Sequence, residues 1–147
     1  FHISNAICWS PDGGIMYFAD SSAKTIWAFD VDGATGAIQN RRIFVELSDE
    51  AGPDGAVTDE KGYLWNAQWG GSRVVRYSPE GGVDFTLELP VSQPSCTAFG
   101  GPDGDLLFVT TARENLTQEQ ISTEPKAGNL FIYQTNVKAA PTPIFGG

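Results

Sequence analysis

The pattern of apolar and polar residues is clearest between positions 52 and 82, where short runs of strand-forming residues alternate with turns. The runs 55–58, 63–68 and 73–77 contain Val, Leu, Trp and Tyr, and a fourth run follows at 83–89. Clusters of Gly, Asp, Ser and Pro, which favour tight turns, separate them. Strands and turns this short predict an antiparallel meander.

The same order of strands and turns occurs three times in the chain. Aligning the first strands of the copies places Asn5, Asp54 and Ser95 in register, 49 and 41 residues apart. The strands are apolar on both faces, as the run 25–29 illustrates, so each sheet needs a neighbour on either side. Repeats of this length with four short strands predict an all-β fold, the β-propeller.

The repeats place three four-stranded antiparallel blades at roughly 3–50, 51–92 and 93–147. Three blades do not close a ring, because propellers have about four to eight. The sequence therefore predicts part of a longer chain, with a half-ring that dimerises as the alternative. In the third blade we expect a short helix within the insertion 112–127 and an outer strand at 142–145.

Composition narrows the choice of partners and location. The net charge of −9 and the pI near 4.3 argue against nucleic acids and acidic membrane surfaces, whose phosphates would be repelled. Cys8 and Cys96 stand in apolar first strands, which predicts buried free thiols and favours a reducing, cytoplasmic location. No apolar run approaches the ~18 residues of a membrane span, and a signal peptide would precede Phe1.

Strand direction gathers polar residues at one end of the blades. In an up-and-down meander, the first strand starts beside the loop that joins the second and third strands, so Asn5 and Asp54 are expected at one mouth near the ring axis. An amide carbonyl and a carboxylate are hard oxygen donors, which suit Ca²⁺, Mg²⁺ or a similar divalent cation. The competing interpretation is that each residue caps a turn. A third, carboxylate ligand is expected from outside the chain.

Two further residues near this mouth are candidates for substrate binding. Trp69 precedes two glycines and could stack on a sugar ring, although blade packing is the commoner role for such a side chain. Arg113 lies at the start of the insertion. A Ser-His-Asp triad has no internal support, because the single histidine is His2, at the start of the chain.

Six motifs, spread along the chain in a fixed order, carry a family resemblance. They are SNAICWSPDG at 4–13, NRR at 40–42, GPDG at 52–55, LWNAQWGGSRV at 64–74, AFGG at 98–101 and TTAR at 110–113. In order and spacing they resemble the C-terminal half of the SMP-30/gluconolactonase/luciferin-regenerating family. The resemblance implies a single six-bladed β-propeller domain, of which residues 1–147 would be the C-terminal half.

The resemblance also implies roles for two residues. Asn5 matches the family's metal-binding asparagine, and Asp54 matches its metal-binding aspartate, which is also proposed as the general base. Ala6 stands where a glycine is commoner, a small change that we expect to leave the adjacent ligand undisturbed. The family's metal-binding glutamate and its substrate-binding residues lie in the N-terminal half, so the chain alone is expected to be inactive.

The function implied by the resemblance is hydrolysis of a sugar lactone to its aldonic acid. One divalent ion, Ca²⁺, Zn²⁺, Mg²⁺ or similar, would polarise the lactone carbonyl. The expected partners are the sugar lactone and either the missing N-terminal half or a second copy of the fragment. Two alternatives stay open: a non-enzymatic calcium-binding or scaffold propeller, and an esterase that acts on another ester.

Overall fold

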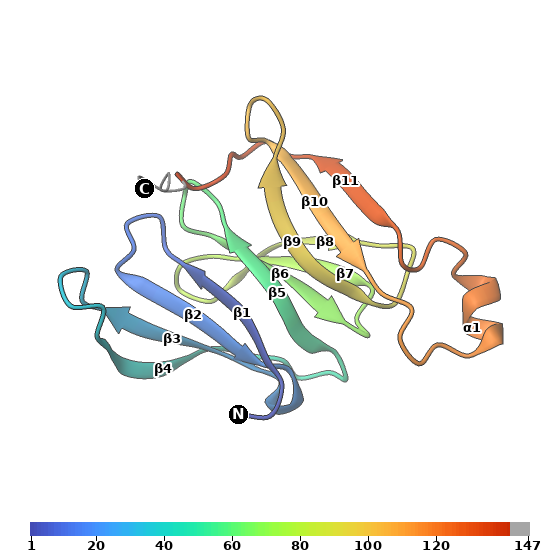
Figure 1. Cartoon of the computed structure of the whole chain (residues 1–147), viewed down its shortest axis with the longest axis horizontal. Coiled ribbons are helices and arrows are strands. Elements are labelled where there is room, and N and C mark those ends of the chain that lie inside the picture. Colours follow the sequence, from blue (N-terminus) through green and yellow to red (C-terminus); the bar gives the residue numbers. More distant parts are fainter. Residues whose placement is uncertain (142–147) are drawn as a thin grey trace.

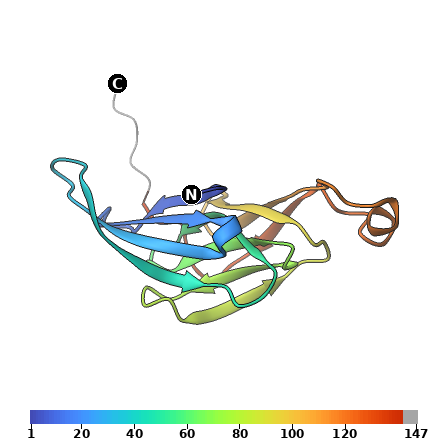
Figure 2. The same ribbon diagram turned by 90° about the horizontal axis from the view of Figure 1, so that it is seen from below.

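The computed structural model describes residues 1–141, which are almost entirely β-structure (Figures 1 and 2). In this part of the chain, eleven strands form three antiparallel sheets, which we call blades 1 to 3. The elements are β1 (Ser4–Trp9), β2 (Ile15–Asp20), η1 (Ser21–Ala23), β3 (Thr25–Val31) and β4 (Ile38–Glu46) in blade 1; β5 (Gly52–Thr58), β6 (Leu64–Trp69), β7 (Arg73–Tyr77) and β8 (Val83–Glu88) in blade 2; and β9 (Pro94–Gly100), β10 (Leu106–Thr111), α1 (Gln118–Thr123) and β11 (Leu130–Gln134) in blade 3.

The strand order confirms the predicted meanders. Blades 1 and 2 run β1-β2-β3-β4 and β5-β6-β7-β8, and blade 3 runs β9-β10-β11. The helix α1 lies in the insertion, as expected, and projects from the side of blade 3 that faces away from blade 1 (Figures 1 and 2). The outer strand expected at 142–145 lies outside the described residues. β5 begins at Gly52 rather than at the predicted Gly55, so Asp54 lies inside the strand.

Apolar side chains fill the spaces between neighbouring blades. Ile26 of blade 1 packs in one cluster with Leu64 and Tyr77 of blade 2. A second cluster joins Val74 of blade 2 to Leu107 of blade 3. The inner strands β1, β5 and β9 lie side by side (Figure 1). Each blade is therefore buried by its neighbour, as the two apolar faces of its strands predicted.

Bulges interrupt the inner strands of blades 1 and 2 near their starts. The register of β1 against β2 shifts between Asn5 and Cys8, and that of β5 against β6 shifts between Pro53 and Ala56. In the first bulge Ala6 has φ of 52°, in the left-handed region, which costs a non-glycine residue about 1–2 kcal/mol. An alanine in this conformation carries backbone strain that a glycine would not carry. That Ala6 leaves the adjacent Asn5 undisturbed stays a prediction.

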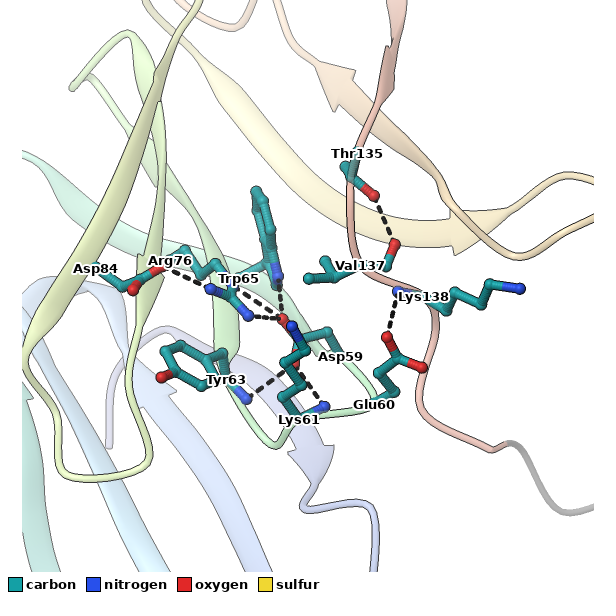
Figure 3. A network of polar contacts seen from close by, with 10 residues as sticks. All are labelled: Asp59, Glu60, Lys61, Tyr63, Trp65, Arg76, Asp84, Thr135, Val137 and Lys138. Carbon is teal, nitrogen blue, oxygen red and sulfur yellow. Dashed lines mark hydrogen bonds and ion pairs between the residues drawn. The ribbon is translucent and has the colours of Figure 1, made fainter.

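A buried ion-pair network stabilises the end of blade 2 that lies opposite the start of β5 (Figure 3). Oδ2 of the fully buried Asp59 accepts hydrogen bonds from Trp65 Nε1 at 3.0 Å and from Arg76 Nε and Nη2 at 2.9 and 2.6 Å. Its Oδ1 accepts from the backbone N–H groups of Lys61 and Tyr63 at 2.9 and 3.1 Å. Since both carboxylate oxygens are satisfied, the network fixes the turn between β5 and β6.

Replacing Arg76 with Leu should lower the free energy of unfolding by about 3 kcal/mol, because the Asp59 carboxylate would stay buried without its cation. Arg42→Leu is the matched control, since Arg42 pairs with Asp30 at the surface, where the two side chains are 45% and 42% exposed. The control should cost less than about 1 kcal/mol. Urea denaturation followed by far-ultraviolet circular dichroism measures both, and equal losses would contradict the role given to Asp59.

Candidate functional site

A depression of about 510 Å³ opens at the end of the blades where β1 and β5 begin. Its lining includes Asn5 and Ser21 from blade 1, Asp54 and Trp69 from blade 2, and Glu114 and Asn115 from the insertion. The structure thus brings together three of the residues that the sequence predicted, Asn5, Asp54 and Trp69. Their meeting at one end of the blades is the arrangement that strand direction predicted.

The side-chain amide of Asn5 has its orientation fixed by a contact between blades. Ser21 Oγ donates its proton to the Pro53 carbonyl oxygen at 2.7 Å, because that carbonyl can only accept. Ser21 Oγ must then accept from Asn5, whose Nδ2 lies 2.8 Å away. With the amide nitrogen committed to Ser21, the carbonyl oxygen Oδ1 of Asn5 is the atom available to a ligand.

The Asp54 carboxyl lies half-buried beside the bulge of β5. Burial raises its pKa from 3.8 to about 6, although the backbone N–H of Gly55 acts in the opposite direction. Within residues 1–141, Lys, Arg and His form no ion pair with it. A carboxylate that burial disfavours, without a cationic partner, is an environment that a bound cation would relieve.

Asn5 and Asp54 do not stand in turns. Each lies inside an inner strand, at the edge of a bulge or within it. The interpretation that the two residues cap turns is therefore wrong. Their role as metal ligands stays a prediction.

Trp69 and Arg113, the two candidates for substrate binding, are placed differently. Trp69 ends β6, is half-buried and lines the depression. Arg113 is exposed, and the stem of its side chain lies against Gly128 rather than in the lining of the depression. The structure therefore leaves Trp69 as the candidate of the two that can face a ligand bound there.

Glu114 and Asn115 line the depression without having been singled out from the sequence. The buried Gln93 donates from Nε2 to the Glu114 carbonyl oxygen at 2.8 Å, which ties this part of the insertion to blade 3. Asn115 has φ of 55°, a left-handed conformation that asparagine tolerates. The signal in the sequence was the length of the insertion, which indicated a functional loop without saying which residues face the mouth.

The donors that this chain supplies suit a hard cation but do not complete its coordination. An amide oxygen and a carboxylate are ligands that Ca²⁺ and Mg²⁺ prefer. Among the described residues, however, no group of three His, Cys, Asp or Glu side chains could hold a metal ion. The residues fit the implied ion as two ligands of a larger set.

The two cysteines are free, and one is more exposed than predicted. Cys8 is half-buried, and burial raises the pKa of its thiol to about 12. Cys96 is exposed, so the prediction of two buried thiols is wrong there. Cys96 instead lies against the bulge of blade 2, where a Cβ at Gly55 would fall 2.5 Å from its Sγ. Glycine at position 55 therefore allows β9 to approach the strand that carries Asp54.

Comparison with solved structures defines the fold class first. The β-propeller domain of Cps50 (Swd1) from Myceliophteria thermophila superposes with a TM-score of 0.64 at 12% identity over 91% of this chain and 41% of that one, which shows the fold alone. Regucalcin from Agrobacterium tumefaciens, a calcium-binding protein, superposes with a TM-score of 0.86 at 35% identity over 95% of this chain and 48% of that one. The three sheets are blades of a β-propeller.

The sequence then gives the family. The chain belongs to the SMP-30/Gluconolactonase/LRE-like family, whose sequence model matches residues 1–113. It is 44% identical over 146 residues to an L-arabinolactonase from Azospirillum brasilense, which covers 99% of this chain and 48% of that protein. The chain therefore spans about half the length of the curated relatives that it matches. Within residues 1–141, no helix has the length and apolar character needed to cross a bilayer.

Asp54→Asn should remove a pH dependence from the stability of the metal-free protein. Because folding raises the pKa of Asp54 from 3.8 to about 6, the protonated form is favoured in the fold. Its stabilising contribution is complete below pH 4 and is lost as the pH rises through about 6. Asparagine stays neutral, so the variant should match the parent at low pH. At pH 8 it should be more stable by about 1 kcal/mol, a figure reduced for the solvent that reaches this half-buried group.

Urea denaturation in the presence of a chelator at pH values on both sides of this range measures that difference. Asp103→Asn is the control, because Asp103 is exposed in the turn between β9 and β10. A stability difference between Asp54→Asn and the parent that stays constant with pH would contradict the environment described for Asp54.

Proposed function

We propose that the protein hydrolyses a sugar lactone to its aldonic acid at the depression where Asn5 and Asp54 meet. The observation that carries the proposal is the convergence of two oxygen donors from different blades: Asn5, whose amide nitrogen is held by Ser21, and Asp54, which has no cationic partner among the described residues. The relative from Azospirillum brasilense, named for its action on a lactone, supports the reaction class. The calcium-binding regucalcin supports a divalent cation as the cofactor.

A divalent cation held by Asn5 Oδ1 and the Asp54 carboxylate would supply a Lewis acid for the lactone carbonyl. Asp54 would also orient the attacking water and take its proton, because a carboxylate can act as a general base. The water oxygen bonds to the carbonyl carbon, the ring C–O bond breaks, and the proton passes to the departing ring oxygen. The products are one carboxylic acid and one hydroxyl group, so atoms and charge balance.

The remaining lining residues suit a sugar. The ring of Trp69 offers an apolar surface for the carbon face of a pyranose or furanose. The side chains of Glu114 and Asn115 offer hydrogen-bond acceptors and donors for sugar hydroxyl groups. A lactone with several hydroxyl groups therefore fits this lining better than an aryl ester does.

The chain supplies two metal ligands, and we propose that the third comes from the part of the propeller that its relatives have in addition. We therefore expect no turnover from residues 1–147 alone. The family's six-bladed ring, with residues 1–147 as its C-terminal half, is part of the same proposal. Activity is to be measured on the longest protein that carries this chain.

In that protein, Asp54→Ala should lower kcat/KM for a sugar lactone by about 10³-fold or more, because it removes a metal ligand and the proton acceptor together. Asn5→Ala should weaken Ca²⁺ binding by less than Asp54→Ala does, since a neutral carbonyl contributes less than a carboxylate. Asp103→Ala, at the opposite end of blade 3, is the control and should keep the parent activity. A pH-stat assay with D-gluconolactone and L-arabinolactone measures turnover, and calorimetry measures Ca²⁺ affinity.

Normal turnover by Asp54→Ala would overturn the assignment of Asp54. A parent protein that binds Ca²⁺ through Asp54 but hydrolyses neither lactone would favour the non-enzymatic calcium-binding alternative. Hydrolysis of aryl esters in preference to both lactones would favour the esterase.

A further inference from the structure

The bulge in β5 leaves part of the inner strand of blade 2 without regular pairing. Pro53 pairs with Gln68 and Ala56 pairs with Asn66, so two residues, Asp54 and Gly55, stand opposite one residue of β6. A bulge of this kind leaves backbone groups outside the ladder and redirects the side chains that it carries. The direction of the Asp54 side chain therefore depends on what fixes the bulge.

Asn66 supplies the contact that the ladder does not. Its Nδ2 donates to the Asp54 carbonyl oxygen at 2.8 Å and lies 3.5 Å from the Gly55 carbonyl oxygen. Asn66 is fully buried, on the face of β6 that packs on blade 1 with Leu64. The donor side of the contact is thus shielded from water, which strengthens a hydrogen bond.

Asparagine lowers stability at a buried packing position such as residue 66. Its Oδ1 is buried and has no hydrogen-bond partner among the described residues. A buried acceptor without a partner costs free energy that an apolar side chain of similar size would not cost. The amide therefore serves the bulge rather than the stability of the interface.

The other two blades have no amide at the corresponding position. In blade 2, Asn66 lies two residues before Gln68, the β6 residue that pairs with Pro53. The corresponding position lies two residues before the partner of Ser4 in blade 1 and two residues before the partner of Pro94 in blade 3. It is occupied by Phe18, which packs on the rings of Phe1 and Trp27, and by the buried Val109. Of the three described blades, blade 2, which presents the carboxylate, is the one with a side-chain amide at this position.

We propose that Asn66 is a positioning residue, whose side-chain amide holds the β5 bulge in the shape that turns the Asp54 carboxylate into the depression. Asn66 acts through the Asp54 backbone and touches neither substrate nor cofactor. The inference rests on the proposed role of Asp54 as a metal ligand. Contacts of this kind, one step behind a ligand, typically change metal affinity by 10- to 100-fold when removed.

The test compares Asn66→Leu with Gln68→Leu in the full protein that carries this chain. Gln68 is a buried amide on the same face of β6, but it donates to Tyr77 and accepts from Arg73 instead of contacting Asp54. Asn66→Leu should leave the melting temperature nearly unchanged, because removing the unpaired acceptor offsets the loss of the hydrogen bond to the Asp54 carbonyl oxygen. It should weaken Ca²⁺ binding at least tenfold by calorimetry. In the chelated protein, the ¹³Cα shifts of Asp54 and Gly55 should also change. Gln68→Leu should lower the melting temperature and leave Ca²⁺ affinity within about twofold.

Asn66→Val is the second variant and replaces Asn66→Leu if the latter does not fold. Wild-type Ca²⁺ affinity with unchanged Asp54 and Gly55 shifts would overturn the proposal, as would an equal loss of affinity in Gln68→Leu. If the parent binds Ca²⁺ but hydrolyses no lactone, weaker binding by Asn66→Leu still supports positioning while the proposed function fails. If the parent binds no Ca²⁺, the ¹³Cα shifts of Asp54 and Gly55 in Asn66→Leu decide the proposal: changed shifts support it, and unchanged shifts overturn it.

Discussion

Burial of apolar sheet faces between neighbouring blades is the interaction on which the rest of the structure depends. Each sheet has apolar residues on both faces and cannot shield either face by itself. Packing blade 2 on blade 1 brings the starts of β1 and β5 together, and Ser21 joins them by linking the Asn5 amide to the Pro53 carbonyl. The oxygen donors of the candidate site are thus placed by hydrophobic packing to which they contribute little themselves.

The inner strands depart from regular geometry where these donors lie. In blade 1 the departure includes a left-handed alanine, Ala6, and in blade 2 it includes Gly55, which leaves room for Cys96 of blade 3. Local strain lowers stability, and so does the buried acceptor of Asn66, which has no partner within residues 1–141. Such costs concentrate at functional sites, which agrees with a site at this end of the blades.

The sequence was sufficient for the features that repeat and insufficient for those set by tertiary contacts. Strand period and turn residues predicted the meanders, and β7 has the bounds expected for it. Strand direction predicted that Asn5 and Asp54 lie at the same end of the blades, and both line one depression there. The bulges were not predicted, because strands that are apolar on both faces do not show the shift in alternation that an extra residue causes. Glu114 was missed because a hydrogen bond from the distant Gln93, rather than local propensity, fixes its position.

A crystal structure of the full protein grown with Ca²⁺ tests the central claim most directly. The account predicts one ion bound by Asn5 Oδ1 and by an Asp54 carboxylate oxygen, each about 2.3–2.6 Å away, with the third protein ligand a carboxylate from outside residues 1–147. The two oxygens would then lie within about 5 Å of each other. A structure in which the two side chains turn apart with the blades intact, or in which Ca²⁺ binds elsewhere, would contradict it.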